Sequence, residues 1–449
     1  MRFPQGLHVL TYDVRGRWED GTEKMARVTG MVTHTHHLLG ALAGRWPRMR
    51  VAVTQSGAVG LGRARAVRTP EGVTVDWRGV ATGFRSLLVD PATGGKDPVR
   101  VARWYDEAVF ESANPVWWSL AGQYAHAIAE AGMRDLLVQT VNALVAVCKA
   151  VEFGLLDPQG LRIVGVVHDA SEDAAGRFRY LADQMDQGRL DLRLIAVSDA
   201  VRAALLAHGL PETALRTVVN GLDVHAFEER LRAAVEGDVF AAVAARHQLP
   251  AQGRRVLTSA RRVPWKGHAD LIHAVARLRD AGRFTDTVLL INGAGLVDSR
   301  YRDYETDLAA LVTDLNLRGS VVLLDPLSTE EVVSCYAAAD VAVLASRAPE
   351  PFGYANVEAM LAGVPVVATG HGGPLTYLEH DVSGLLVPPS DPPALADALG
   401  RLLTDPALRA RIGAAGRDSA RRLTVEAMLD GYTDVLTADR SALAGAGAR

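Results

Sequence analysis

Short apolar runs rich in β-branched residues alternate with helical patterns along most of the chain, and this alternation constrains the fold more than any other feature. In the first half such runs lie at 7–14, 49–56, 135–141, 162–169, 193–198 and 215–223. In the second half they lie at 255–262, 286–295, 320–327, 341–347, 365–370 and 384–389. Continuous apolar strands joined by helices are typical of parallel sheets that are covered on both faces. We therefore predict an α/β protein with doubly wound parallel sheets.

A change of pattern near the middle divides the chain. Residues 224–252 contain no strand pattern and end in a loop of Pro, Gly and Arg, so we interpret them as the connection between domains. A chain of 449 residues is also long for a single core. We predict a Rossmann-like domain at 1–225, joined by a C-terminal helix at about 424–440, and a second Rossmann-like domain at 250–420. We expect the two domains to face a cleft, with the ligand at the carboxyl ends of the strands.

The composition excludes some classes of protein. The net charge of −4 leaves no basic footprint for nucleic acid. No run reaches the roughly 18 apolar residues of a membrane span, and the N-terminus does not resemble a signal peptide. Cys148 and Cys335 stand in apolar helical contexts, which predicts buried free thiols in a reducing cytoplasm. We expect no nucleic-acid partner and no stable membrane insertion, and a homodimer stays open.

The stretch "EPFGYANVE" places Glu350 and Glu358 on either side of a Phe-Gly turn. A strand precedes this turn and a helix is predicted to begin near Tyr354, so the amides of 354–357 are expected to be free and to favour an anion. Gly353 allows the backbone to approach a ligand closely. Two carboxylates beside an anion site would repel a bare phosphate. They suit a ligand whose hydroxyl groups, on the two sides of a diphosphate, donate hydrogen bonds to them, as in a nucleotide sugar. For either glutamate alone, an ordinary role in a loop or in capping the helix is the favoured explanation, but not for both together in this setting.

The stretch "SARRVPWKGHADLI" follows another strand. Arg261, Arg262 and Lys266 come with Gly267 before a helix, which is a typical setting for a phosphate group. A surface turn with ordinary charges explains this stretch equally well by itself.

Taken together, these motifs resemble a known family. The pattern covers most of residues 195–405 and includes "VVNGLDVHAF", "INGAG", "EPFGYANVEAMLAGVPVVAT" and "GGPLTYLEHDVSGLLVPP". It is similar to the retaining GT-B glycosyltransferases of family 4, the glycosyl transferases group 1, which include sucrose synthase-like and mannosyltransferase members. The first ~190 residues match this family only weakly. The resemblance implies that the domain at 1–225 binds the acceptor and that the domain at 250–420 binds the nucleotide-sugar donor.

The resemblance implies two sets of site residues. The catalytic set is His168, Arg261, Lys266 and Glu350. The donor-binding set is Gly267, Phe352, Gly353, Tyr354, Ala355, Asn356 and Glu358.

The same resemblance assigns roles within these sets. Arg261 and Lys266 are expected to hold the donor diphosphate, and Glu350 to contact the hydroxyls of the donor sugar. Glu358 is expected to bind the ribose, and His168, in "VVHDA", to lie near the reacting sugar. The implied reaction moves a hexosyl group, of glucosyl or N-acetylglucosaminyl type, from an NDP-sugar, with UDP as the expected nucleotide, and retains the anomeric configuration. It requires no metal, and no cofactor apart from the sugar nucleotide as co-substrate.

Two departures from the family pattern stand out. Ala260 replaces a glycine and Arg262 replaces a leucine in the phosphate turn, so Arg262 offers an extra cation. The glycine-rich loop that follows the first strand in many relatives has no clear equivalent, and Gly16, Gly21 and Gly30 are all candidates.

Two further segments permit more than one interpretation. In "THTHH", His34, His36 and His37 do not share a helical face, so a metal site is not expected, whereas a role beside the acceptor stays open. The aromatic-rich residues 104–126 suit helix packing and an acceptor wall equally well.

For the acceptor, the nearly neutral first half favours a small polar molecule such as a cyclitol or a sugar. A lipid-linked or polysaccharide acceptor stays open, as do a GT-B epimerase or phosphorylase and a non-catalytic binder of sugar nucleotides.

Overall fold

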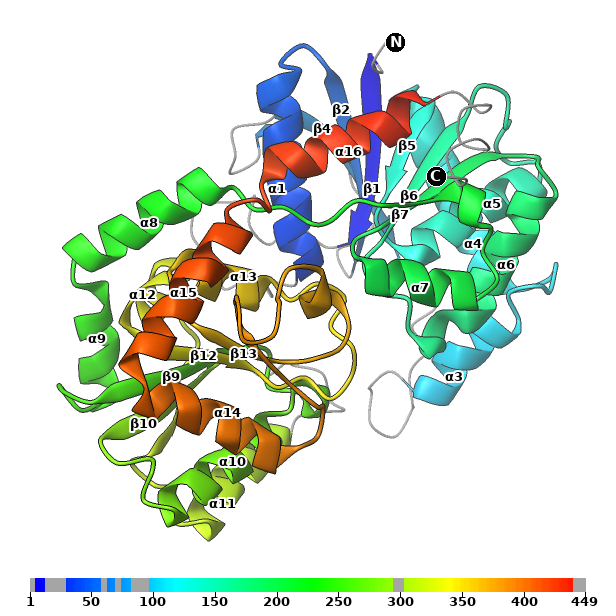
Figure 1. The fold of residues 1–449 in the computed structure, drawn as a ribbon. Helices are drawn as coiled ribbons and strands as arrows, with labels where there is room; N and C mark the ends of the chain where they lie inside the picture. Colours follow the sequence, from blue (N-terminus) through cyan, green and yellow to red (C-terminus); the bar gives the residue numbers. More distant parts are fainter. Residues whose placement is uncertain are drawn as a thin grey trace. The chain divides into compact units, whose positions relative to one another are not determined.

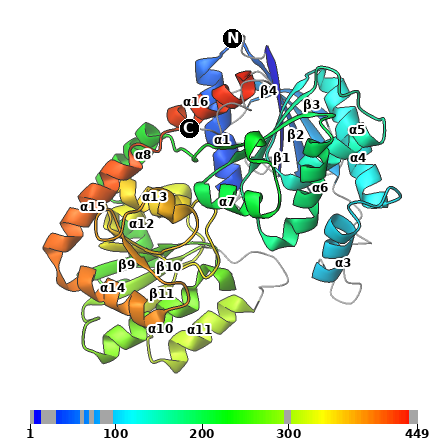
Figure 2. The same cartoon turned by 45° about the vertical axis from the view of Figure 1, so that its right-hand side comes forward.

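The computed structural model describes residues 5–12, 30–57, 63–68, 74–81, 97–293 and 303–438. The chain divides into two compact units (Figures 1 and 2). Unit 1 is Met1–Gly221 with Val425–Arg449, and unit 2 is Leu222–Thr424. Each unit has its own core and its own sheet, which is parallel apart from one edge strand of unit 1, as predicted for a doubly wound α/β protein.

The sheet of unit 1 has the order β3-β4-β2-β1-β5-β6-β7-β8. Its strands are β1 (Gly6–Tyr12), β2 (Arg50–Gly57), β3 (Arg63–Arg68), β4 (Thr74–Ala81), β5 (Asp135–Val138), β6 (Arg162–Val167), β7 (Asp191–Ala196) and β8 (Leu215–Thr217). Only β3 runs antiparallel to its neighbour among the described strands. The chain leaves β1 toward β2 and later returns to the other side of β1 with β5, so the strand order reverses between β1 and β5.

Helices cover both faces of this sheet. They are α1 (Gly30–Arg45), α3 (Pro98–Ala102), α4 (Pro115–Ala131), α5 (Val141–Glu152), α6 (Ala175–Asp186), α7 (Asp199–Ala207) and α16 (Val425–Thr437), with a π-helical turn at Arg103–Glu107. Right-handed crossovers in opposite directions place α1 and α5 on opposite faces. The returning helix α16, red in Figure 1, packs against α1 and β7.

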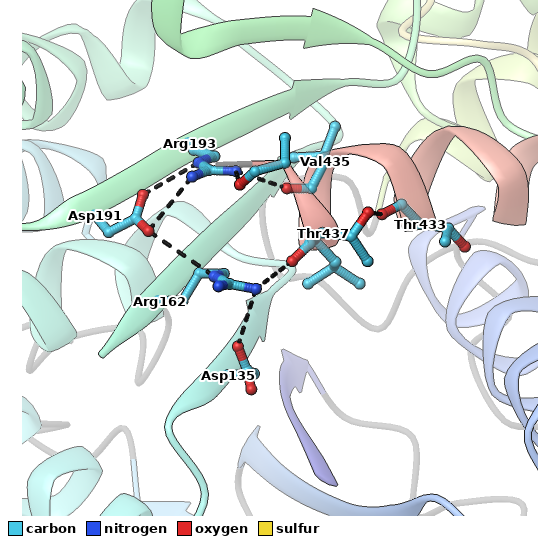
Figure 3. Close-up of polar contacts among 9 residues, drawn as sticks. Asp135, Arg162, Asp191, Arg193, Thr433, Val435 and Thr437 are labelled. Carbon is cyan, nitrogen blue, oxygen red and sulfur yellow. Dashed lines mark hydrogen bonds and ion pairs between the residues drawn. The ribbon is translucent and has the colours of Figure 1, made fainter. Parts of the chain in front are cut away.

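Two arginines hold the C-terminal end of α16 (Figure 3). Arg193 on β7 donates to the carbonyl oxygens of Val435 at 3.0 Å and Ala438 at 2.5 Å, and Arg162 on β6 donates to the carbonyl of Leu436. Asp191 pairs with Arg193 at 3.1 Å, which keeps the buried guanidinium in place. The last carbonyls of a helix have no partners within the helix and carry partial negative charge. The two guanidinium groups supply both the missing hydrogen-bond donors and a compensating positive charge.

The sheet of unit 2 has the order β11-β10-β9-β12-β13-β14, and every pairing in it is parallel. Its strands are β9 (Arg254–Ser259), β10 (Thr287–Asn292), β11 (Val321–Leu323), β12 (Val341–Leu344), β13 (Val366–Thr369) and β14 (Leu385–Val387). Its helices are α8 (Val224–Glu236), α9 (Val239–Arg246), α10 (His268–Asp280), α11 (Tyr304–Asp314), α12 (Thr329–Ala338), α13 (Tyr354–Leu361), α14 (Pro392–Thr404) and α15 (Pro406–Ala420). The strand order reverses between β9 and β12.

The structure differs from the sequence-based prediction at several elements. The strand predicted at 135–141 ends at Val138, because Thr140 caps α5 by accepting from the amide of Ala143 at 3.2 Å. Residues 224–252, interpreted as a connection, contain α8 and α9, which pack against α12 within unit 2. The pair β3 and β4 was not predicted.

Several side chains of the aromatic-rich segment belong to the core. Tyr105, Trp117 and Tyr124 are buried, and the Tyr105 and Trp117 rings meet edge to face with centroids 5.4 Å apart. Both cysteines are buried and free, as predicted. Within the described ranges, no helix combines the length and the hydropathy that crossing a bilayer would require.

We predict that Arg193→Met lowers the free energy of unfolding by about 2 kcal/mol, because the carbonyls at the end of α16 and the carboxylate of Asp191 lose a charged donor. Denaturation by urea measures this loss, and hydrogen exchange in α16 should rise with it. The matched control is Arg202→Met, which breaks the more exposed pair with Glu212 and should cost less than about 1 kcal/mol. Equal losses in both variants would contradict a special role for Arg193.

Candidate functional site

The candidate site lies at the carboxyl ends of β9 and β12, where the strand order of unit 2 reverses. These two strands are neighbours, with Val256 paired to Val341 and Leu257 to Ala342. Open parallel sheets bind ligands at such a reversal, because the loops that follow the two strands lead away in opposite directions. The loop after β9 carries Arg261 and Lys266, and the loop after β12 carries Glu350.

The backbones of these two loops touch. A Cβ atom added to Gly267 would lie 1.8 Å from the carbonyl oxygen of Ala345, and Gly267 has a φ of +72°, which glycine adopts without strain. The amide of Arg347 donates to the carbonyl of Trp265 at 2.7 Å. The arginine side chain also holds Asp270 on α10 through two hydrogen bonds of 2.7 Å. The loops therefore form one connected structure.

This contact brings Lys266 to Glu350. The ammonium of Lys266 and the hydroxyl of Ser346 both donate to the same carboxylate oxygen of Glu350, which is 4% exposed. Burial lowers the pKa of Lys266, while the charge and hydrogen bond of Glu350 raise it. A buried ammonium beside one carboxylate can readily accept a second anionic partner, since this compensates for lost hydration.

The two arginines of the phosphate turn have different environments. Arg261 is half-buried, its guanidinium lies 6.0 Å from the centre of the Trp265 ring, and its charge contributes to lowering the pKa of Lys266. Arg262 instead points into the protein, where it pairs with Glu305 at 2.6 Å and donates to the carbonyls of Ile291 and Leu324. The prediction that Arg262 adds a cation for the ligand is therefore wrong, because the side chain is buried and both terminal nitrogens are held by structural contacts.

The side chain of Tyr377 fixes the turn at Phe352 and Gly353 through the backbone carbonyls of the turn. The hydroxyl of Tyr377 donates to the carbonyl of Phe352 at 2.7 Å and lies 3.2 Å from that of Gly353. A Cβ on Gly353, where φ is +90°, would lie 2.9 Å from this hydroxyl. With the carbonyls turned toward Tyr377, the conformation of the turn is set before any ligand binds.

The helix α13 begins at Tyr354, as predicted, and has no side-chain cap at Gly353. Ala355 is the second residue of this helix and is half-buried. The prediction that all the amides of 354–357 are free is wrong at Asn356, whose amide donates to the carbonyl of Gly353 at 3.0 Å. The side chain of Asn356 is buried and lies 3.2 Å from the hydroxyl of Tyr377.

Glu358 lies one turn further along α13, in a different environment from Glu350. Its carboxylate accepts a hydrogen bond of 3.0 Å from Tyr336 on α12. Burial raises the pKa of Glu358 to about 7, against the smaller opposing effects of Tyr336 and Arg230. Burial and Glu358 also raise the pKa of Tyr354, so the tyrosine stays protonated. Glu358 can therefore accept or donate hydrogen bonds near neutral pH.

Not every predicted site residue belongs to this group. His168 lies in unit 1, directly after β6, and burial lowers its pKa to about 4. Gly16 and Gly21 lie outside the described residues, and Gly30 begins α1. No cluster of metal-ligating side chains is found in the parts of the chain that the structure describes.

Three supporting residues were missed by the sequence analysis. Ser346, Tyr336 and Tyr377 each contact a predicted site residue, but they lie 4, 22 and 25 residues from their partners. Ser346 follows a predicted strand end, which is a usable signal. The two tyrosines lie in apolar helical and loop contexts that give no sign of their contacts.

The part of the chain that carries this site matches a known family model. The family model "Glycosyl transferases group 1" matches residues 241–419. This part of the chain is a glycosyl transferases group 1 domain. It contains every predicted site residue except His168.

Curated relatives match over part of their length. A D-inositol 3-phosphate glycosyltransferase of Saccharomonospora viridis is 34% identical over 237 residues, covering 51% of this chain and 52% of the relative. The enzyme of the same name from Xylanimonas cellulosilytica is 32% identical over 262 residues, covering 55% and 60%. The chain thus spans about half the length of the curated relatives that it matches.

Solved structures match nearly the whole chain. Anabaena HepE, solved with UDP and glucose, has a TM-score of 0.66 at 21% identity, covering 96% of this chain and 99% of HepE. An α,α-trehalose-phosphate synthase of Burkholderia xenovorans has a TM-score of 0.72 at 14% identity, covering 96% and 100%. These similarities confirm the predicted GT-B fold class.

We predict that Gly267→Ala destabilises unit 2 far more than Gly282→Ala. Both glycines have a similar positive φ, +72° and +67°, so both variants lose about 1–2 kcal/mol from backbone strain. A Cβ atom added to Gly267 would clash with another backbone segment, whereas one added to Gly282 would meet nothing within 4 Å. The clash should therefore destabilise Gly267→Ala by about 1–3 kcal/mol more than Gly282→Ala. Chemical denaturation of the two variants measures the difference, and equal costs would show that the close contact is unimportant.

We also predict that Glu358 changes the pH dependence of stability. The pKa of this carboxyl is about 7 in the folded protein against an ordinary 4.5, so between these values the folded state holds a proton that the unfolded state has lost. The free energy of unfolding therefore falls as the pH rises from about 4.5 to 7. Glu358→Gln should remove this part of the slope in urea denaturation measured from pH 5 to 8.

A second variant tests the cause of this slope. Tyr336→Phe removes the hydrogen bond that lowers the pKa of Glu358, so the slope should extend to higher pH. An identical slope in the wild type and in Glu358→Gln would contradict the assignment.

Proposed function

We propose that this chain is a glycosyltransferase that moves a hexosyl group from a nucleotide sugar, with UDP as the nucleotide, to a small hydroxyl-rich acceptor and retains the anomeric configuration. The observation that carries the proposal is the buried pair of Lys266 and Glu350 at the strand reversal of unit 2, inside the matched domain. An ammonium and a carboxylate at one point suit a ligand in which phosphate oxygens and sugar hydroxyls are adjacent.

The chemistry follows from where charge develops. The bond between the anomeric carbon and the diphosphate oxygen breaks, and the leaving diphosphate gains negative charge. Lys266, Arg261 and the start of α13 stabilise this charge as it forms. The anionic ligand also favours the charged form of Lys266, whose pKa is lowered by burial in the free protein.

The second half of the reaction concerns the acceptor. Its hydroxyl oxygen bonds to the anomeric carbon on the face that the diphosphate leaves, and its proton goes to the departing phosphate oxygen. This front-face path needs no protein nucleophile. Glu350, fixed by Lys266 and Ser346, is assigned to the hydroxyls of the donor sugar, Glu358 to the ribose, and His168 to the reacting sugar.

For the acceptor we propose a cyclitol or sugar, with or without a phosphate group. The curated relatives are named for inositol 3-phosphate, and the trehalose-phosphate synthase was solved with glucose-6-phosphate. These names support an acceptor that is small and rich in hydroxyl groups.

We predict that Lys266→Met lowers kcat by about 10²–10³, because it removes a charge that stabilises the leaving diphosphate. Glu350→Gln should also remove most transfer, since the amide cannot hold the lysine in the same way. Steady-state kinetics with the active donor measure both losses. The control is Arg277→Met on the exposed outer part of α10, which should leave kcat unchanged. Near-wild-type turnover in Lys266→Met would contradict the site assignment.

The donor and acceptor are tested together with an array of UDP-, GDP- and ADP-sugars against free inositol, inositol phosphates, sugars and sugar phosphates, analysed by mass spectrometry. We expect a new glycoside with a UDP-sugar, and NMR of the product should show a retained anomeric configuration. Conversion of the donor without any acceptor would instead indicate an epimerase. Transfer only to lipid-linked or polymeric acceptors would contradict the small acceptor.

A further inference from the structure

Three aromatic side chains from distant parts of unit 1, one of them the predicted catalytic histidine, are in contact. His34 comes from α1, His168 follows β6, and Tyr432 lies on α16, 398 residues after His34. The rings of His34 and His168 meet edge to face with centroids 4.6 Å apart and an interplanar angle of 72°. The hydroxyl of Tyr432 lies 2.9 Å from Nε2 of His34.

The middle ring of this group is firmly held. His34 is fully buried, and burial with the neighbouring His168 and His37 holds its pKa well below the ordinary value, against a hydrogen bond with Asn220 that raises it. A neutral imidazole has one N–H donor and one acceptor nitrogen, so the contact with Tyr432 helps to select its tautomer and orientation. Tyr432 is itself fully buried, so its hydroxyl needs such a partner.

His168 is held differently. Its Nε2 is buried and has no hydrogen-bond partner among the described residues. Burial lowers its pKa to about 4, so the ring is neutral near pH 7. With no hydrogen bond at Nε2 within the described part of the chain, the direction of this ring depends on how its neighbours hold it.

We propose that His34 and Tyr432 are positioning residues that hold the ring of His168 in the orientation used for transfer. Tyr432 fixes His34 through the hydrogen bond, and His34 fixes His168 through the edge-to-face contact. The inference rests on the proposed function, because His168 is assigned to the reacting sugar there. It makes the C-terminal helix α16 part of the support of the site within unit 1.

The decisive variant is Tyr432→Phe, which keeps the ring and removes only the hydroxyl. We expect kcat to fall about tenfold, as for neighbouring residues that act together. The affinity for UDP should not change, because the residues predicted to bind the nucleotide and its diphosphate all lie in unit 2. In a His168→Ala background the same substitution should cause no further loss of kcat, since there is no ring left to orient.

The matched control is Asp430→Asn. This change breaks the exposed ion pair between Arg45 on α1 and Asp430 on α16, and so weakens the contact between the same two helices without touching the rings. We expect kcat to remain at the wild-type value. An equal loss of kcat in Asp430→Asn, or a full further loss from Tyr432→Phe in the His168→Ala background, would overturn the positioning role and leave only a role in packing.

A measurement without turnover separates this inference from the proposed function. ¹⁵N NMR of the histidine rings reports the tautomer of His34 and the environment of His168, whether or not the protein transfers sugar. Tyr432→Phe should shift the ring signals of both histidines, and Asp430→Asn should shift neither. Unchanged signals of His168 in Tyr432→Phe would overturn the inference, even if the array finds a transferase. Shifted signals with no transfer in the array would mean that the proposed function alone has failed.

Discussion

The contact between Gly267 and the carbonyl of Ala345 determines the geometry of the candidate site. At a Cβ distance of 1.8 Å, no residue with a side chain fits between the two loops without moving one of them. Because the loops meet here, Lys266 reaches Glu350, and Ser346 reaches the same carboxylate oxygen. The cation and the carboxylate are therefore in place before a ligand arrives, so little reorganisation is required on binding.

The two glutamates of "EPFGYANVE" show how differently the fold can treat identical side chains. Glu350 has the ammonium of Lys266 and the hydroxyl of Ser346 on one carboxylate oxygen. Glu358 has a neutral phenol as its hydrogen-bond donor, and burial moves its pKa to about 7. A pair with such different environments suits two separate binding tasks, and their spacing of eight residues places one in a loop and the other inside a helix.

Much of this site could be predicted from the sequence, because its parts are local. The strand before each loop, the start of α13 at Tyr354 and the need for glycine at 267 and 353 all follow from residues near one another in the chain. The pairing of Lys266 with Glu350 could not be derived, since 84 residues separate them. Arg262 was misassigned for the same reason, because its partner Glu305 lies 43 residues away.

Unit 1 was harder to predict. The pair β3 and β4 contains arginines and a tryptophan rather than a continuous apolar run, and the role of His34 depends on a tyrosine near the other end of the chain. Contacts of this kind leave no periodic pattern in the sequence. Each partner also fits the apolar pattern of its own helix, so nothing marks it as part of a long-range contact. Local sequence patterns therefore do not predict which single residues contact each other when they lie far apart in the chain.

The position of α16 has a consequence for the order of folding during synthesis. Unit 2 is continuous in sequence, whereas unit 1 is completed only by residues after Thr424. The sheet of unit 1 therefore leaves the ribosome first but must wait for some 200 further residues before α16 can cover it and fill the place beside β7. Until then the apolar surface that receives Met428, Leu429 and Tyr432 stays uncovered, so a nascent chain halted within unit 2 should be a substrate for chaperones.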